Sequence, residues 1–297
     1  MADEHTMEPE HTGEPDVPRM IHRVFDPTDA DVFYHYCSNE TLRLICEHKT
    51  LRFSDVNMLN DYAESRWGYM IFEDAASLLL RRESKKPMGF TRGFFDCVDP
   101  HLAEFQHFKH GAVCSFSRSG DILSQWRAYA DEGKGVCIGF GGKTLRNLDA
   151  WRLKVEYDRE RQTVEFAHCL MDIFHSDDAE IFVERCRAAA LLALGFKNPA
   201  FHEEREIRCV HMLDVKEEQG KPLLRSPDGH EVRFRTQGAD IIAYVDLPIS
   251  LKIDPQPIKR IIMGPKNLNK PGNLQYMLRA AGFGEPSEIV RSSASLV

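Results

Sequence analysis

The stretch NPAFHEEREIRCV at residues 198–210 raises the central question about this chain. If it forms a strand, successive side chains point to opposite faces, so Glu204, Glu206 and Arg208 share one face. A solvated edge strand with surface ion pairs would show the same pattern, and such pairs contribute little stability. The stretch therefore predicts a strand that carries either functional carboxylates or an ordinary exposed face.

The rest of the chain divides into short segments of strand and helix type. The strands come in blocks, and helices fall between these blocks without regular alternation. This order favours an α+β fold with mixed, mostly antiparallel sheets over a doubly wound fold. No G-x-G-x-x-G or Walker-type loop is present, and FGGK at 140–143 predicts a turn. The expected strands are 32–36, 50–55, 111–117, 135–140, 151–158, 231–236, 240–247 and 258–264, and the expected helices are 40–49 (capped by Ser38 or Asn39), 58–83, 121–131, 161–174, 178–196 and 273–282.

Length and charge indicate one globular unit behind an acidic tail. A chain of 297 residues with 42% hydrophobic residues can bury a sizeable core. The first 16 residues contain six acidic residues and no Lys or Arg, so we expect residues 1–29 to form a disordered tail and lead-in, followed by a single domain over 30–297. No apolar run is long enough to span a bilayer and no signal peptide is evident, which predicts a cytoplasmic protein without a membrane partner.

Cysteine and histidine spacing indicates no metal site. The eight cysteines include no C-x-x-C pair, and we expect them to be reduced and buried. His101, His107 and His110 cluster in HLAEFQHFKH, but neither paired cysteines nor an H-E-x-x-H motif accompanies them.

Five ordered motifs between residues 32 and 266 resemble a bacterial family called domain of unknown function twenty-nine seventy-one. The motifs are FYHYCS, LRFSDVNMLND, CSFS followed by SQWRAYADEGKGVCIGF, FHEEREIR, and IKRIIMGPK. This resemblance implies a common fold and no particular activity.

Three patches also resemble the ADP-ribosyltransferase superfamily, and they occur in the superfamily's order. FYHYCSNETLRLICEHKTLRFSD resembles its opening strand–helix–strand unit, CSFS resembles its Ser-x-Ser strand, and EEREIR resembles its late Glu-x-Glu strand. The resemblance implies an ADP-ribosyltransferase-like core in which the sheets form a cleft for NAD as substrate. The helices at 161–196 would be insertions in that core.

The resemblance and the side-chain chemistry assign the same roles. Glu206 would stabilise the positive charge that develops on the sugar as nicotinamide departs. Glu204 would position or deprotonate the acceptor, and His35 would hydrogen-bond a ribose hydroxyl. The other expected NAD contacts are Tyr34, Tyr36, Ser115, Ser117, Trp126, Tyr129 and Arg208. We expect His35, a serine of the CSFS strand and Glu206 to converge from three strands on one cleft.

Each of these residues also has a structural interpretation. His35, between two aromatic residues, would then be a core histidine, and the two serines would make local hydrogen bonds. Trp126 would belong to the core because it lies on an apolar helical stripe. Arg208 would pair with Glu206 for stability alone.

Three functions compete on this basis. The first is an ADP-ribosyltransferase or NAD glycohydrolase acting on a macromolecular target. Such an enzyme would serve in a bacterial phage-defence or toxin system. The second is a non-enzymatic nucleotide-sensing or protein-binding module. The third is a metal-dependent nuclease with Glu204, Glu206, Asp55 and Asp61 as ligands. Acceptor choice would lie in loops or inserts, which we expect at 84–110 and 214–230.

Overall fold

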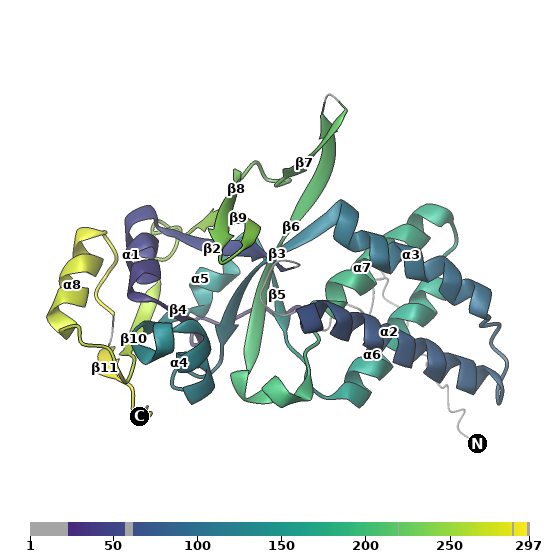
Figure 1. Cartoon of the computed structure of the whole chain (residues 1–297), viewed down its shortest axis with the longest axis horizontal. Helices are drawn as coiled ribbons and strands as arrows, with labels where there is room; N and C mark the ends of the chain where they lie inside the picture. The colour runs from purple at the N-terminus through teal and green to yellow at the C-terminus, as the bar shows by residue number, and fades with distance from the viewer. Residues whose placement is uncertain (1–22, 57–61, 219, 287, 296–297) are drawn as a thin grey trace, which may run out of the picture.

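The computed structural model describes residues 23–56, 62–218, 220–286 and 288–295, without the side chains of 62–65, 103–110 and 237. The described strands form one sheet that curves through the middle of the molecule (Figure 1). Its strands are β1 (Val32–Cys37), β2 (Thr50–Asp55), β3 (Lys109–Ser117), β4 (Val136–Gly141), β5 (Trp151–Lys154), β6 (Glu206–Glu218), β7 (Lys221–Arg225), β8 (Val232–Gln237), β9 (Asp240–Pro248), β10 (Ile258–Met263) and β11 (Glu288–Arg291).

The sheet is mixed and mostly antiparallel, as expected for an α+β fold. Its main path runs β11-β10-β4-β1-β3-β2-β9-β8, and only the β10–β11 pair among the described pairs is parallel. Strand β3 pairs with β6 along its whole length. Both β1 and β2 therefore pair with the opposite edge of β3, β1 at Ser117 and β2 at Val113 and Ala112.

Strand β6 divides its second edge between two partners. The first part of this edge pairs with β5 as far as Val210, and the last part pairs with β7 from Asp214 onward. His211, Met212 and Leu213 lie between these two ladders. A gap in the pairing thus interrupts one edge of the longest strand.

Most of the described helices fall into two groups, each with its own apolar core (Figure 1). One core joins the sheet to α1, α5 and α8, and the other lies among α2, α3, α6 and α7. The helices are α1 (Asn39–His48), α2 (Tyr62–Glu83), α3 (Arg92–Phe108), α4 (Leu123–Tyr129), α5 (Gly142–Arg146), α6 (Arg159–Phe174), α7 (Ala179–Ala193) and α8 (Pro271–Ala280). No helix in the described ranges is long and apolar enough to cross a membrane.

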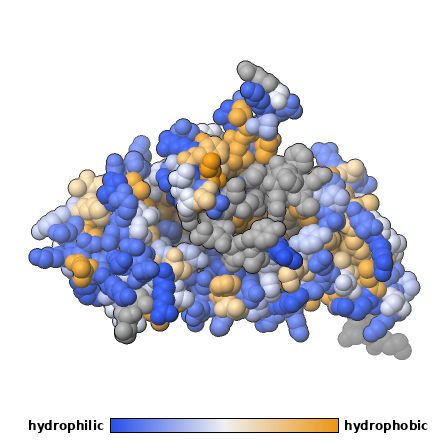
Figure 2. All heavy atoms as spheres, viewed as in Figure 1, coloured by the Kyte–Doolittle hydropathy of each residue, from blue (hydrophilic) through white to orange (hydrophobic). Residues whose placement is uncertain are grey.

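The end of β6 and strand β7 form a hairpin that projects from the body of the molecule (Figure 1), and apolar side chains of β7, β8 and β9 are exposed (Figure 2). Phe234 and Ile241 are 64% and 62% exposed, and Leu223 is 40% exposed. Strand β8 ends the main sheet path and carries Arg233 and Arg235. Charged side chains on an edge strand oppose pairing with other chains.

The sequence located most elements and missed several boundaries. The strand expected at 198–210 begins only at Glu206, because Asn198 and Pro199 start a 3-10 helix that runs to Glu204. Arg205 then adopts a left-handed conformation with φ of 47°. The turn expected at 140–143 overlaps the start of α5. The segments expected as loops at 84–110 and 214–230 contain α3, the end of β6 and β7.

The acidic tail lies mainly outside the described residues. Residues 1–22 are among those that the structure does not describe, so the expected disorder there stays a prediction. The lead-in from Arg23 onward packs on the fold. Its guanidinium contacts Glu165 and Glu156, and Val24 forms a β-bridge with Leu153.

Candidate functional site

The two strands that carry the expected catalytic motifs lie side by side. Strand pairing places Ser115 opposite Arg208 and Ser117 opposite Glu206. Because directly opposite residues of an antiparallel pair point to the same face, these four side chains share one face of the sheet. Tyr34 joins them, since it is opposite Ser117 on the other side of β3.

Glu206 is a buried, ionised carboxylate. It is 6% exposed, and Arg208 donates to it from Nε at 2.9 Å and from Nη2 at 3.3 Å. Burial by itself would raise the pKa of Glu206, but the charges of Arg208 and Lys197 and hydrogen bonds from Arg208 and Ser115 lower it to about 2. Ser115 is exposed, so this carboxylate has one neighbour that reaches solvent.

Lys197 completes the cluster, and the sequence analysis did not identify it. Its ammonium donates to Glu204 at 2.6 Å and to Glu206 at 3.1 Å, although Glu204 lies in the 3-10 helix and not on β6. Ser117 Oγ donates to the Glu204 carbonyl at 2.6 Å. The cluster links Lys197 and Glu204, which precede β6, to Glu206 and Arg208 on β6, as a buried structural network would.

His35 does not join this cluster, so the expected convergence of three strands is wrong. Strand alternation places His35 on the face opposite Tyr34. Its ring lies 5.6 Å from that of Phe116, and its Nδ1–H donates to the Ser115 carbonyl at 3.0 Å. Burial lowers the pKa of His35, partly offset by that hydrogen bond. The half-buried histidine thus packs on the core side of the sheet.

The aromatic residues expected to contact nicotinamide are also separated. Trp126 is fully buried and its ring meets that of Tyr36 edge-on, so both belong to an apolar cluster with Tyr34 at its margin. Tyr129 is 52% exposed. Of the proposed nuclease ligands, Asp61 lies outside the described residues and Asp55 is buried on β2.

The cluster of His101, His107 and His110, which spans the second half of α3 and the start of β3, is only partly described. The ring of His101 contacts that of Phe182, while the side chains of His107 and His110 lie outside the described part of the chain.

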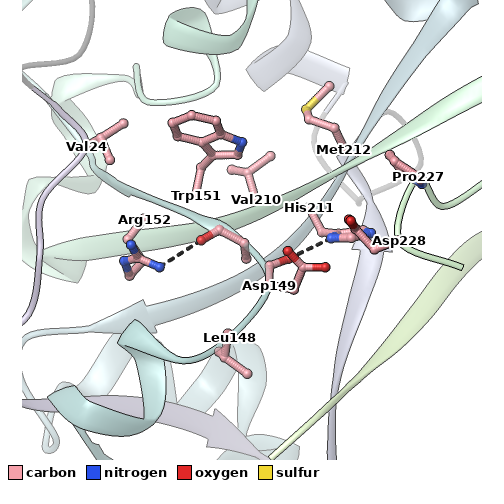
Figure 3. A pocket seen from close by; sticks show the side chains of 11 residues that line it. Val24, Leu148, Asp149, Trp151, Arg152, Val210, His211, Met212, Pro227 and Asp228 are labelled. Carbon is pink, nitrogen blue, oxygen red and sulfur yellow. Dashed lines mark hydrogen bonds between the residues drawn. The ribbon is translucent and has the colours of Figure 1, made fainter. Parts of the chain in front are cut away.

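A pocket of about 420 Å³ occupies the gap on the edge of β6 (Figure 3). The segment before β5 forms one side of it and the loop after β7 forms another. Val210, His211 and Met212 of β6 lie between them. The remaining lining residues are Val24, Leu148, Asp149, Ala150, Trp151, Arg152, Pro227 and Asp228.

Two carboxylates and a histidine meet in this pocket. One ligand atom each from Asp149, His211 and Asp228 lies within 4.8 Å of the others. His230 lies beside them, with Nε2 3.6 Å from an Asp149 carboxylate oxygen. Burial, and then a hydrogen bond and the like charge from Asp228, raise the pKa of Asp149. Carboxylates this close repel one another unless a proton or a cation lies between them.

The backbone orients His211 in this cluster. Its Nδ1–H donates to the Asp149 carbonyl at 2.6 Å, and Nε2 lies 2.9 Å from Ser226 Oγ. Metal-binding histidines commonly donate their second ring N–H to a carbonyl in the same way. Imidazole and carboxylate groups together suit divalent ions such as Zn²⁺ and Mn²⁺.

No spacing in the sequence marks this cluster. Asp149, His211 and Asp228 come from three separate segments, so no metal motif of fixed spacing includes them. They meet because β5 and β7 leave the middle of one edge of β6 unpaired.

Comparison with known proteins identifies one family. No curated protein and no solved structure matches the chain. Residues 125–209, from α4 to the start of β6, match the model of a family described as protein of unknown function, DUF2971. This match includes Asp149, Glu206 and Arg208. The match supports, over residues 125–209, the resemblance to this family that the ordered motifs indicated.

Proposed function

We propose that this protein is a metal-dependent phosphoesterase whose active site is the pocket at the gap in β6. The observation that carries the proposal is the meeting of ligand atoms from Asp149, His211 and Asp228 in a pocket of about 420 Å³. Three protein ligands leave coordination positions for water and substrate. A divalent ion held there would polarise a phosphoryl oxygen and lower the pKa of a bound water.

Arg152 supports a phosphoryl substrate over a neutral one. Its side chain is 17% exposed and lines the pocket. The guanidinium donates to the backbone carbonyls of Ala150 at 2.9 Å and Phe25 at 3.4 Å, which hold it in place. A guanidinium orders an anionic oxygen well, because its planar donors are always charged.

Calorimetric titration with Zn²⁺ and Mn²⁺ tests the metal site directly. We expect one ion per chain to bind, a higher melting temperature with the ion, and hydrolysis of bis-p-nitrophenyl phosphate that stops with EDTA. Asp228→Asn should weaken binding by at least about tenfold because it removes one charged ligand. Asp177→Asn, an exposed carboxylate between α6 and α7, is the matched control. Absence of metal binding, or unchanged turnover in Asp228→Asn, would refute the proposal.

ADP-ribosyl transfer is the second candidate, and one observation favours it. The exposed Ser115 hydrogen-bonds the ionised Glu206, on the face that also carries Tyr34. The candidate is weaker because His35 lies on the other face and because Arg208 and Lys197 both contact the carboxylate. Incubation with NAD separates the two functions. Nicotinamide released without metal, and lost in Glu206→Gln, would favour transfer or NAD hydrolysis over the phosphoesterase.

A further inference from the structure

We propose that Ser226 is the nucleophile of this pocket, so that hydrolysis proceeds in two displacements through a covalent phosphoserine ester. This inference rests on the proposed phosphoesterase function and specifies its mechanism. Ser226 directly follows β7 and is 7% exposed, and its hydroxyl contacts the ring of His211.

A tight turn places Ser226 beside the ligand Asp228. Residues 226–229 are Ser-Pro-Asp-Gly, and the Gly229 N–H donates to the Ser226 carbonyl at 3.2 Å. Proline suits the second position of such a turn because its φ is already fixed, and Gly229 has a φ of 80° that other residues adopt only with strain. The local sequence therefore holds the hydroxyl and the carboxylate two residues apart at the pocket, which Pro227 and Asp228 line (Figure 3).

The hydrogen bonds of His211 locate the proton between this ring and Ser226. A backbone carbonyl can only accept, so Nδ1, which lies 2.6 Å from the Asp149 carbonyl, carries the ring proton. Nε2 of the neutral ring is then an acceptor, and the Ser226 hydroxyl donates to it at 2.9 Å. A serine that donates to a histidine whose other N–H is held by a third group has the arrangement of an activated nucleophile.

The same geometry places the hydroxyl oxygen within reach of the ion. Because Nδ1 is held by the carbonyl, Nε2 is the His211 atom that remains to bind metal. Two donor atoms on a tetrahedral Zn²⁺ ion lie about 3.4 Å apart, because each bond is about 2.0–2.1 Å long. Ser226 Oγ is 2.9 Å from Nε2, so an increase of about 0.5 Å in this distance allows both atoms to bind one ion. Binding to the ion lowers the pKa of the hydroxyl and makes it a stronger nucleophile.

The two displacements form and break one bond to phosphorus each. In the first, Ser226 Oγ bonds to phosphorus as the bond to the leaving oxygen breaks, the hydroxyl proton passes to water, and the leaving oxygen takes a proton from water. In the second, a water molecule gives its hydroxyl to phosphorus and one proton to Oγ as the bond between Oγ and phosphorus breaks. The ester and one water thus become an alcohol and a phosphate with one ester group fewer.

Arg152 is placed to hold the phosphoryl oxygens in both steps. It pairs with Cys209 across β5 and β6, so its side chain shares a face of the sheet with that of His211, two residues further along β6. Diagonal neighbours of this kind lie about 7–8 Å apart, which leaves room for a phosphoryl group between them.

The stereochemical course of hydrolysis by the intact protein tests this inference separately from the metal site. Zn²⁺-loaded protein hydrolyses one stereoisomer of O-methyl O-(4-nitrophenyl) phosphorothioate in water enriched in ¹⁸O. Each in-line displacement inverts the configuration at phosphorus, so two displacements give retention and direct attack by water gives inversion. We expect retention. Inversion would overturn this inference while the metal site stands.

Variants connect the covalent step to Ser226. Ser226→Ala should lower turnover of bis-p-nitrophenyl phosphate on the order of a hundredfold or more, as expected when a nucleophile is removed. Zn²⁺ should still bind, because all three ligands remain. Ser54→Ala, at an equally buried serine on β2, is the control and should keep the parent turnover.

Two results would contradict the proposal at different levels. Parent-like turnover in a folded Ser226→Ala protein that binds Zn²⁺ would overturn this inference alone. Failure of the parent protein to bind Zn²⁺, or to hydrolyse either ester with the ion, would overturn the proposed function and this inference with it.

Discussion

At the scale of single residues, burial changes what a charged motif means. Glu206 and Arg208 on an exposed strand would form an ion pair of small value. In the structure they are 6% and 4% exposed, and Lys197 is 4% exposed. Removing one member of a buried ionic cluster leaves the others without their partner and out of contact with water. The cluster therefore contributes to stability whether or not Glu206 also serves catalysis.

Glu206→Gln should lower the free energy of unfolding by about 3 kcal/mol, because Arg208 and Lys197 lose their common counter-charge. Urea denaturation at neutral pH measures this loss. Glu218→Gln is the matched control, since its pair with Arg225 is about half exposed and should contribute little to stability. Equal, small effects in both variants would show that the buried cluster has no special energetic role.

The low pKa of Glu206 predicts how the free energy of unfolding depends on pH. The folded pKa of Glu206 is about 2, below its ordinary value of 4.5. The stabilisation is therefore fully present above pH 4.5 and is lost as the pH falls from there towards 2, because the unfolded chain binds the proton first. Denaturation midpoints across this window should fall more steeply for the parent protein than for Glu206→Gln. Parallel curves would contradict the low pKa.

At the scale of elements, α1 shows how the local sequence sets both ends of a helix. Ser38 Oγ accepts a hydrogen bond from the Thr41 N–H, as expected for an N-cap. At the other end Lys49 adopts a left-handed conformation with φ of 55°, and its N–H donates to the Ile45 carbonyl at 2.8 Å. Glycine adopts this conformation with less strain than lysine.

Opposite changes at these two ends should move stability in opposite directions. Ser38→Ala should lower the free energy of unfolding by about 1 kcal/mol because it removes the cap. Lys49→Gly should raise the free energy of unfolding by up to about 1 kcal/mol, because glycine has no Cβ and adopts the left-handed conformation without the strain that lysine has there. Thermal and urea denaturation of both variants give the comparison. A loss of stability in Lys49→Gly would mean that the lysine side chain contributes more than the strain.

At the scale of the whole molecule, the lead-in at Arg23–Phe25 connects parts that are far apart in sequence. Arg23 contacts Glu165 of α6 and donates to the Lys154 carbonyl of β5 at 3.1 Å. Val24 lines the pocket. This segment thus joins the sheet, the helical core and the candidate site.

Two truncations should therefore differ sharply. Removal of residues 1–18 should leave the melting temperature almost unchanged, because they are acidic, polar and lack an apolar period. Removal of residues 1–26 also deletes Arg23 and Val24 and should lower the melting temperature by several degrees, as expected for the loss of a partly buried ion-pair network. Similar melting temperatures for the two would show that the lead-in contributes little.

Local patterns were sufficient to predict much of the fold. Apolar periodicity located α6, α7 and the buried strand β4, and Ser38 marked the start of α1. The five ordered motifs indicated the family that residues 125–209 match. These features depend on residues within a few positions of one another, so the chain encodes them directly.

Only the tertiary structure shows which face of the sheet a side chain lies on and which residues distant in sequence come together. Whether His35 shares a face with Glu206 depends on the pairing of β1 with β3, and a shift of one residue reverses the answer. Asp149, His211 and Asp228 meet only because β5 and β7 end short of one another along β6. Lys197 reaches both glutamates because a 3-10 helix turns the chain back before β6 begins. These contacts depend on strand register and on where the strands end. The local spacing of residue types in the sequence indicates neither of these.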